Sequence, residues 1–160
     1  MLYRPSRLMQ HVVLPILDAS HSAVEGHETL EMEEVSPGLW RLLHSPAFVL
    51  GIARGDVVRL DAQVPAGFEV HERSGFIAVT VSLPKGVNAS TSSLESSFRV
   101  LGGFPEGGPE NVAVFNVPAS VGFPAIEEVF TEFSSVQGGV EWAFSNVYGQ
   151  RGEVLECWAT

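Results

Sequence analysis

Apolar and polar residues alternate in short runs along the first half of the chain, and turn residues separate these runs. Alternation with a period of two is typical of half-buried strands, and Gly, Pro and Ser clusters are typical of the turns between them. The pattern predicts six strands, at residues 8–17, 27–34, 39–43, 57–60, 68–73 and 76–83. The second and third of these strands are predicted to form a hairpin. Because Pro15 cannot donate to a ladder of hydrogen bonds, the first strand is expected at an edge or near a strand end.

The sixth predicted strand differs from the others. Its run from Phe76 to Val81 is apolar with little alternation, which is typical of a strand that is covered on both faces. Six short strands separated by turns indicate a meander or a small barrel.

The apolar positions change to a helical period in the second half of the chain. Leu94, Phe98 and Leu101 fall on one face of a short helix, whose start fits a capping box made by Ser92 and Glu95. A second helix follows Ser120, and its apolar stripe is made by Phe123, Ile126, Phe130 and Phe133. Strands are predicted at 112–117 and 140–148 and an edge strand at 153–158, while FPEGGPE at 104–110 is predicted to be a loop.

These elements predict an α+β protein with a single domain over residues 1–160. Its strand-rich half, at 8–83, is the meander or small barrel, and its helix-containing half, at 90–158, is an αβαβ segment packed into the same domain. The length lies within the usual range for one domain, and 45% of the residues are hydrophobic, so we expect a real core.

The charge of the chain limits its partners. The formal net charge is −10, with 19 acidic and 9 basic residues. Nucleic acids and anionic membranes are bound by clustered Lys and Arg, so we expect neither as a partner. No stretch approaches the roughly 20 apolar residues that cross a bilayer. An acidic surface favours a basic protein partner.

Cys157 is the only cysteine, so the chain has no intramolecular disulfide and needs no oxidising compartment. We expect a cytoplasmic protein. The apolar run Val12 to Leu17 is interrupted by Pro15 and is shorter than a secretory h-region, so we expect no signal peptide.

Three stretches carry a resemblance to a known family. They are GLWRLLHSPAFVLGIARGDVV, ERSG at residues 72–75, and the later αβαβ pattern. With these stretches the chain resembles the bacterial family catalogued as domain of unknown function 4265, from about Glu28 to Trp142. The resemblance implies an architecture, and it implies no activity and no catalytic residues.

Gly55 and Asp56 are similar to a glycine-aspartate turn that opens strands in small β-barrels. Glycine accepts a positive φ, and the carboxylate of Asp56 can accept hydrogen bonds from the N–H groups just beyond it. We interpret Asp56 as a structural residue, and a functional Asp56 is the alternative.

The densest charge cluster is the candidate binding site. Its members could meet across two neighbouring strands, and they are Arg54, Asp56, Arg59, His71 and Arg73. Paired arginines can hold an anionic group, and histidine can carry a proton near neutral pH. Cross-strand ion pairs on the solvent side are the simpler interpretation of the same residues.

The sequence contains no established catalytic or cofactor motif. Neither a GxxxxGK nor a GxGxxG string occurs at a strand-to-helix turn, and no GxSxG string occurs. His21, Glu25, His27 and Glu28 have no known metal-site spacing, so a solvated acidic loop is the preferred interpretation. We therefore assign no catalytic residue, no metal and no cofactor.

Three hypotheses about function follow. The favoured one is a non-catalytic interaction domain that binds another protein, as antitoxin or immunity proteins do. The second is a small enzyme or anion-binding domain that uses the arginine, histidine and aspartate cluster. The third is a homo-oligomeric module that pairs through an exposed sheet edge.

Overall fold

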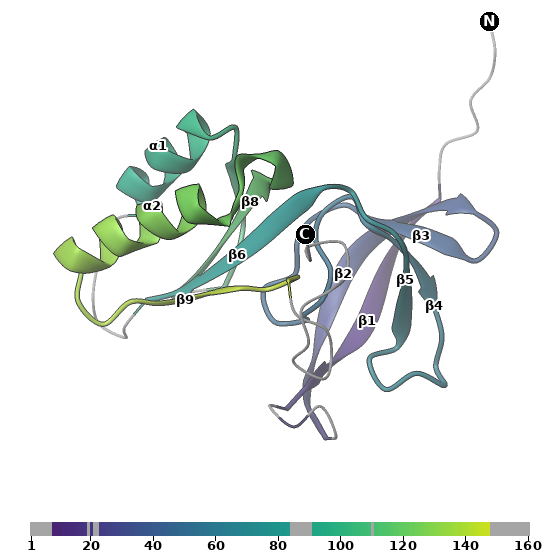
Figure 1. Cartoon of the computed structure of the whole chain (residues 1–160). Coiled ribbons are helices and arrows are strands. Elements are labelled where there is room, and N and C mark those ends of the chain that lie inside the picture. Colours follow the sequence, from purple (N-terminus) through teal and green to yellow (C-terminus); the bar gives the residue numbers. More distant parts are fainter. Residues whose placement is uncertain (1–7, 19, 21–22, 84–90, 110, 148–160) are drawn as a thin grey trace, which may run out of the picture.

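The computed structural model describes residues 8–18, 20, 23–83, 91–109 and 111–147. Two antiparallel sheets lie side by side in these residues, and two α-helices cover one face of the second sheet (Figure 1). The chain is thus α+β, as predicted. That it forms a single domain stays a prediction. None of the helices in the described ranges combines the length and the apolar character that crossing a membrane requires.

The first sheet is a five-stranded meander in which each strand pairs with the next one in the chain. Its strands are β1 (Met9–Leu17), β2 (Val24–Ser36), β3 (Leu39–Leu42), β4 (Val57–Leu60) and β5 (Phe68–Glu72). The predicted hairpin is confirmed as β2 and β3, and β1 is an edge strand, as Pro15 required. The order has β1 and β5 at its two edges, so the meander alternative is confirmed and the closed barrel is not.

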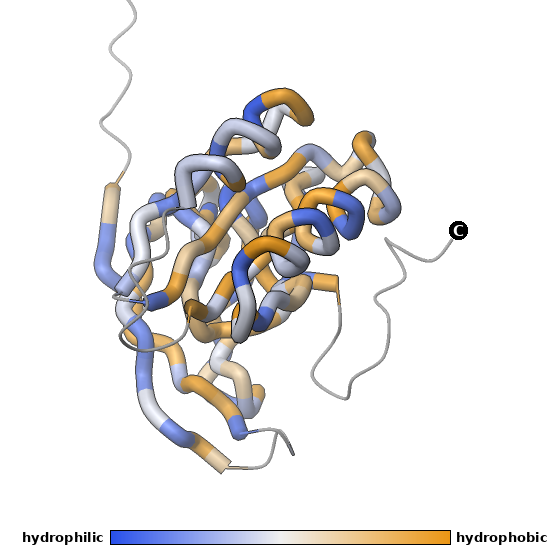
Figure 2. Tube along the Cα trace, turned by 90° about the vertical axis from the view of Figure 1, so that its left-hand side faces the viewer, coloured by the Kyte–Doolittle hydropathy of each residue, from blue (hydrophilic) through white to orange (hydrophobic). Residues whose placement is uncertain are grey.

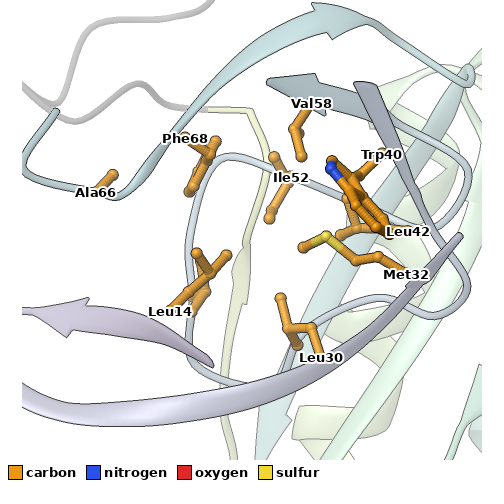
Figure 3. Packing of buried hydrophobic residues seen from close by; sticks show 10 residues of the cluster. Leu14, Leu30, Met32, Trp40, Leu42, Ile52, Val58, Ala66 and Phe68 are labelled. Atoms are coloured by element: carbon orange, nitrogen blue, oxygen red, sulfur yellow. The ribbon is translucent and has the colours of Figure 1, made fainter. Parts of the chain in front are cut away.

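Alternation along these strands produces the first core. Residues on one face of the curled sheet point toward one another (Figure 3). They include Leu14, Leu30, Met32, Trp40, Leu42, Val58 and Phe68, and the loop residue Ile52 completes the cluster. Burial of such side chains stabilises a fold by about 1.5–3 kcal/mol each, so this core holds the curl of the sheet.

The second sheet has the strand order β7-β8-β6-β9. Its strands are β6 (Phe76–Ser82), β7 (Phe104–Glu106), β8 (Val112–Pro118) and β9 (Glu141–Phe144). The sixth strand of the predicted meander therefore belongs to the second sheet instead. The tight turn at Gly75, with φ of 94°, separates it from β5 and redirects the chain.

Two helices cover one face of the second sheet, α1 (Ser92–Val100) and α2 (Phe123–Val136), with a short 3-10 turn, η1 (Ala119–Val121), before α2. Hydrophobic and hydrophilic positions follow one another along both helices (Figure 2). Their apolar stripes pack on the sheet through Leu94, Phe98, Ile126 and Phe130, opposite Val79 and Phe115. The predicted stripe of the second helix is confirmed, with Glu127, Glu128 and Glu132 exposed on its other face.

Two details of the second half differ from the sequence-based expectation, and a third prediction falls outside the described residues. FPEGGPE contains β7, a strand of three residues that is too short to show a pattern. The first helix is capped at Thr91 without a side-chain hydrogen bond from that residue, so Ser92 is its first helical residue and the predicted capping box is wrong. The predicted edge strand at 153–158 lies outside the described residues.

Candidate functional site: a polar junction between the sheets

The loop from residue 43 to residue 56 connects β3 to β4 and bridges the two sheets. We call it the crossing loop. Its ends close on the first sheet, where Gly55 N–H donates to Leu42 O at 2.9 Å and Leu42 N–H donates to Asp56 O at 3.0 Å. Its middle reaches the second sheet, where Gly51 N–H donates to Ser145 O at 2.7 Å. Ala78 of β6 is fully buried, whereas Thr80 on the same face of the strand is half-buried and Ser82 is exposed, so the predicted cover on both faces holds for only part of β6.

Asp56 anchors one end of the crossing loop. Its side chain is only 1% exposed, and its carboxylate accepts hydrogen bonds from Ala53 N–H at 2.9 Å and from Ser74 N–H at 2.8 Å. Arg73 Nη1 lies 3.2 Å from Asp56 Oδ2 and also donates to Gly51 O at 2.6 Å. Asp56 thus has the predicted structural role. Its N–H donors are Ala53, three residues before it, and Ser74, on a distant turn, and not the residues just beyond Asp56.

Glu106 anchors the crossing loop to the second sheet. One oxygen, Oε1, accepts hydrogen bonds from Ser45 N–H at 3.2 Å, Arg54 Nη1 at 3.1 Å and Asn116 Nδ2 at 2.7 Å. Ser45 Oγ donates to Asn116 Oδ1 at 2.5 Å and accepts from Arg54 N–H at 2.8 Å. Because Glu106 is 8% exposed, these donors replace the water that its charge would otherwise bind. We call these residues, with Asp56, Arg73 and Ser74, the polar junction.

Glu28 holds the middle of the crossing loop. Its carboxylate accepts hydrogen bonds from three successive N–H groups, those of Ala47 at 2.8 Å, Phe48 at 3.0 Å and Val49 at 2.9 Å. Three donors converging on one carboxylate fix the backbone in this conformation. Val49 turns into the first core, whereas Phe48 and Leu50 are exposed, by 46% and 54%.

The five residues predicted to bind a ligand are divided by the structure. Arg54, Asp56 and Arg73 meet at the polar junction, where each arginine is paired with an internal acid. Arg59 lies exposed in the middle of β4, opposite Glu69 of β5. His71 is exposed on β5 at an irregularity in the pairing of β4 with β5. Ligand binding by this set stays a prediction.

Sequence reasoning missed the acids that organise the junction. Glu106 lies in a stretch of turn residues, where the sequence gives no sign of a buried acid. For Glu28 the sequence suggests only metal binding as a role to consider. Asn116 does stand out in the sequence, because an amide inside the apolar run VAVFNVP must find hydrogen-bond partners once it is buried. In the described ranges no group of three or more His, Cys, Asp or Glu side chains is arranged to hold a metal ion.

A groove of about 330 Å³ lies between the crossing loop and the second sheet, on the face without helices. Thr80 and Ser82 of β6, with Ala143 and Ser145 near β9, line its floor, and Glu141 adds a carboxylate. Ala47, Phe48 and Leu50 form its wall. The arrangement is a shallow, largely apolar surface with acid at its rim, which suits binding better than proton transfer.

The sequence matches the family model described as Domain of unknown function (DUF4265) over residues 28–142, in agreement with the resemblance. None of the curated proteins compared matches the chain. The fold is similar to a solved structure described as a novel crystal structure of a hypothetical protein from Neisseria gonorrhoeae, with a TM-score of 0.67 at 14% sequence identity. That similarity covers 89% of this chain and 96% of the other, so the two share a fold.

Proposed function

The chain belongs to the family described as Domain of unknown function (DUF4265), which names no activity, and we propose that it is a non-catalytic module that binds another protein. The partner is a basic protein, and the binding surface is the crossing loop with the groove beside it. Immunity proteins and antitoxins act in this way, by covering a partner without chemistry. The proposal includes a cytoplasmic location.

One observation carries the proposal, namely that the partly buried carboxylate of Glu28 holds exposed apolar side chains in place. Phe48 and Leu50 are exposed, yet the backbone that bears them is fixed by the carboxylate of Glu28. A surface that is ordered before binding loses little conformational entropy on association, and aromatic side chains contribute strongly to interfaces. A fixed phenylalanine that remains 46% exposed offers apolar surface to a partner.

Charge supports a basic partner. The chain has a net charge of −10, and the exposed Glu141 lies at the groove. An acidic surface attracts a basic protein over long range and speeds its association. The pairing of Arg54 and Arg73 with Glu106 and Asp56 further supports this choice, because these two arginines are already paired and do not offset the acids elsewhere in the chain.

The non-catalytic part of the proposal is supported by the use of the charged groups. General acid-base catalysis needs a proton carrier that can reach a substrate. The carboxylate of Asp56 is buried and hydrogen-bonded to backbone N–H groups, and Glu106 accepts three hydrogen bonds of its own. The cytoplasmic location is supported by Cys157 being the only cysteine.

Affinity capture with matched baits tests the proposal. The baits are the wild type, a variant with Phe48→Ser and Leu50→Ser, and a control with Val100→Ser and Val136→Ser, two valines that are each 86% exposed on the helices. We expect a basic protein that the wild type and the control retain and the loop variant loses. The binding of this basic protein to the purified wild type should weaken as salt is added. Equal capture by all three baits, or no enriched protein, would overturn the proposal.

A further inference from the structure

The edges of the two sheets differ in how well they are protected against pairing with another strand. The edge strand β5 carries Glu69 and Glu72, β9 is four residues long and starts at Glu141, and β7 is three residues long with Pro105 at its centre. Short length, charge and proline each keep an edge from pairing with another strand. β1 is nine residues long, MQHVVLPIL, and contains no Asp, Glu, Lys or Arg. Among the described residues, the part of β1 before Pro15 is the stretch of sheet edge without such protection.

The backbone groups of β1 that bond to no other described residue follow from its pairing with β2. Glu34 N–H donates to Leu8 O at 3.0 Å, and the register places Met9 opposite Glu33 and His11 opposite Glu31. In an antiparallel pair, alternate residues direct their N–H and C=O groups to the partner strand. Leu8 and the even-numbered residues after it therefore bond β2, and Met9, His11 and Val13 direct their backbone groups outward.

The free part of this edge is bounded at residue 13. Pro15, the next outward position, has no N–H group. Gly67, in the loop before β5, packs so closely against Leu14 and Pro15 that an added Cβ would lie 3.3–3.4 Å from their side chains. Met9, His11 and Val13 are by contrast exposed, Val13 by 59%. The structure thus offers a strand-pairing edge of five residues, from 9 to 13.

We propose that a second copy of this chain pairs with this edge, antiparallel, about a twofold axis at His11. This register sets Met9 opposite Val13 of the second copy, and His11 opposite its counterpart. Each outward N–H group then finds an outward C=O group, and Pro15 stays outside the pairing. The proposal concerns a different surface from the crossing loop and does not depend on the proposed function.

A second copy is favoured over a basic partner by the charge of the edge. β1 has no acid to attract a basic strand, and an edge without charged residues lets two chains of net charge −10 approach with less repulsion than an acidic edge would. Glu31, which lies 3.4 Å from His11 Nε2, and Glu33 flank the edge on β2. In the dimer these acids lie three strand spacings, about 14 Å, from their counterparts on the other β2, where they repel at low ionic strength. Added salt should therefore strengthen association.

Sedimentation equilibrium of the full chain tests the pairing, with Val13→Glu compared with Val24→Glu. Val24 is an equally exposed valine on β2, so the two variants add the same charge at matched exposure. We expect a wild-type dimer that tightens with salt, and a Val24→Glu dimer of similar affinity. Association of Val13→Glu should be at least about tenfold weaker, because each new carboxylate replaces the apolar contact with Met9 of the second copy and adds negative charge to the interface. Urea unfolding confirms that each variant is folded.

Hydrogen exchange locates the interface. On raising the concentration through the dimer transition, the amides of Met9, His11 and Val13 should gain protection, whereas amides already bonded to β2 should not change. Three results would overturn the proposal: monomer mass up to the solubility limit, equal weakening in both variants, or a dimer without protection at these amides.

Discussion

Arg73 and Asp56 form an ion pair between the end of β5 and the start of β4, with Arg73 Nη1 3.2 Å from Asp56 Oδ2. The same guanidinium nitrogen donates to Gly51 O, so one side chain joins the acid to the crossing loop. Nothing in this arrangement requires a ligand, because the acid has its hydrogen-bond donors within the chain. The pair is therefore first of all a determinant of stability.

Asp56→Ala should lower the free energy of unfolding by about 3–5 kcal/mol, because it leaves a partly buried guanidinium and two N–H groups without their acceptor. The urea midpoint measures this loss. Glu69→Ala, an exposed acid on β5, should stay within about 0.5 kcal/mol of the wild type. A midpoint for Asp56→Ala equal to that of Glu69→Ala would contradict the anchoring role.

Glu106 and Arg54 should couple only weakly, although Glu106 itself matters. The Arg54 side chain is 43% exposed, so water screens its 3.1 Å contact with Glu106. We expect Glu106→Ala to cost about 2–3 kcal/mol, because Ser45 N–H and Asn116 Nδ2 lose their acceptor. A double-mutant cycle with Arg54→Ala should give a coupling below about 1 kcal/mol. A larger coupling would mean that the ion pair dominates.

The sequence predicted the secondary structure well wherever the apolar period was long. The stripe from Phe123 to Phe133 and the alternation of β2 each repeat over many residues, and burial requires that repetition. β7 could not be found in this way, since three residues cannot display a period and Phe104 is followed by proline. The assignment of β6 to the second sheet depends on the direction that the chain takes at Gly75. The sequence predicts a turn at Ser74 and Gly75, but no local pattern gives its direction.

The candidate site was harder to predict for a physical reason. Arg54, Asp56 and Arg73 were selected as a charge cluster, and they do lie near one another, but the sequence could not supply their partners. Glu106 is distant in the chain and reaches Arg54 only because the crossing loop packs on the second sheet. The charged residues in the sequence therefore indicate which side chains lie close together, and only the tertiary contacts distinguish a binding pocket from an internal network.

Gly103 is a position where no side chain fits. A Cβ there would lie 2.7 Å from Asn116 O and 3.1 Å from Phe98 O, both backbone atoms that the helix and the sheet hold. Gly103→Ala should destabilise the protein by about 2–3 kcal/mol. Gly107→Ala, with no atom within 4 Å of the added Cβ, should leave the protein unchanged or up to about 1 kcal/mol more stable. Thermal unfolding of the two variants checks the contrast, and equal melting temperatures would refute it.

Glu28→Ala separates the fixing of the crossing loop from the stability of the whole fold. Removing the carboxylate leaves the N–H groups of Ala47, Phe48 and Val49 without an acceptor, so their hydrogen exchange should speed up at least about tenfold. Water can reach Phe48, so the global loss should be moderate, about 1–3 kcal/mol.

Glu25→Ala is the matched control, because Glu25 is exposed on the same strand and should leave exchange in the loop unchanged. Glu28→Gln keeps one acceptor oxygen, so its exchange rates at these amides should fall between those of Glu28→Ala and Glu25→Ala. If the loop is ordered by its packing on the first core instead, Glu28→Ala will exchange like the wild type, since Val49 and Ile52 remain buried. Faster exchange confined to the amides of Ala47, Phe48 and Val49 would show that Glu28 on β2 fixes the backbone that bears the exposed Phe48.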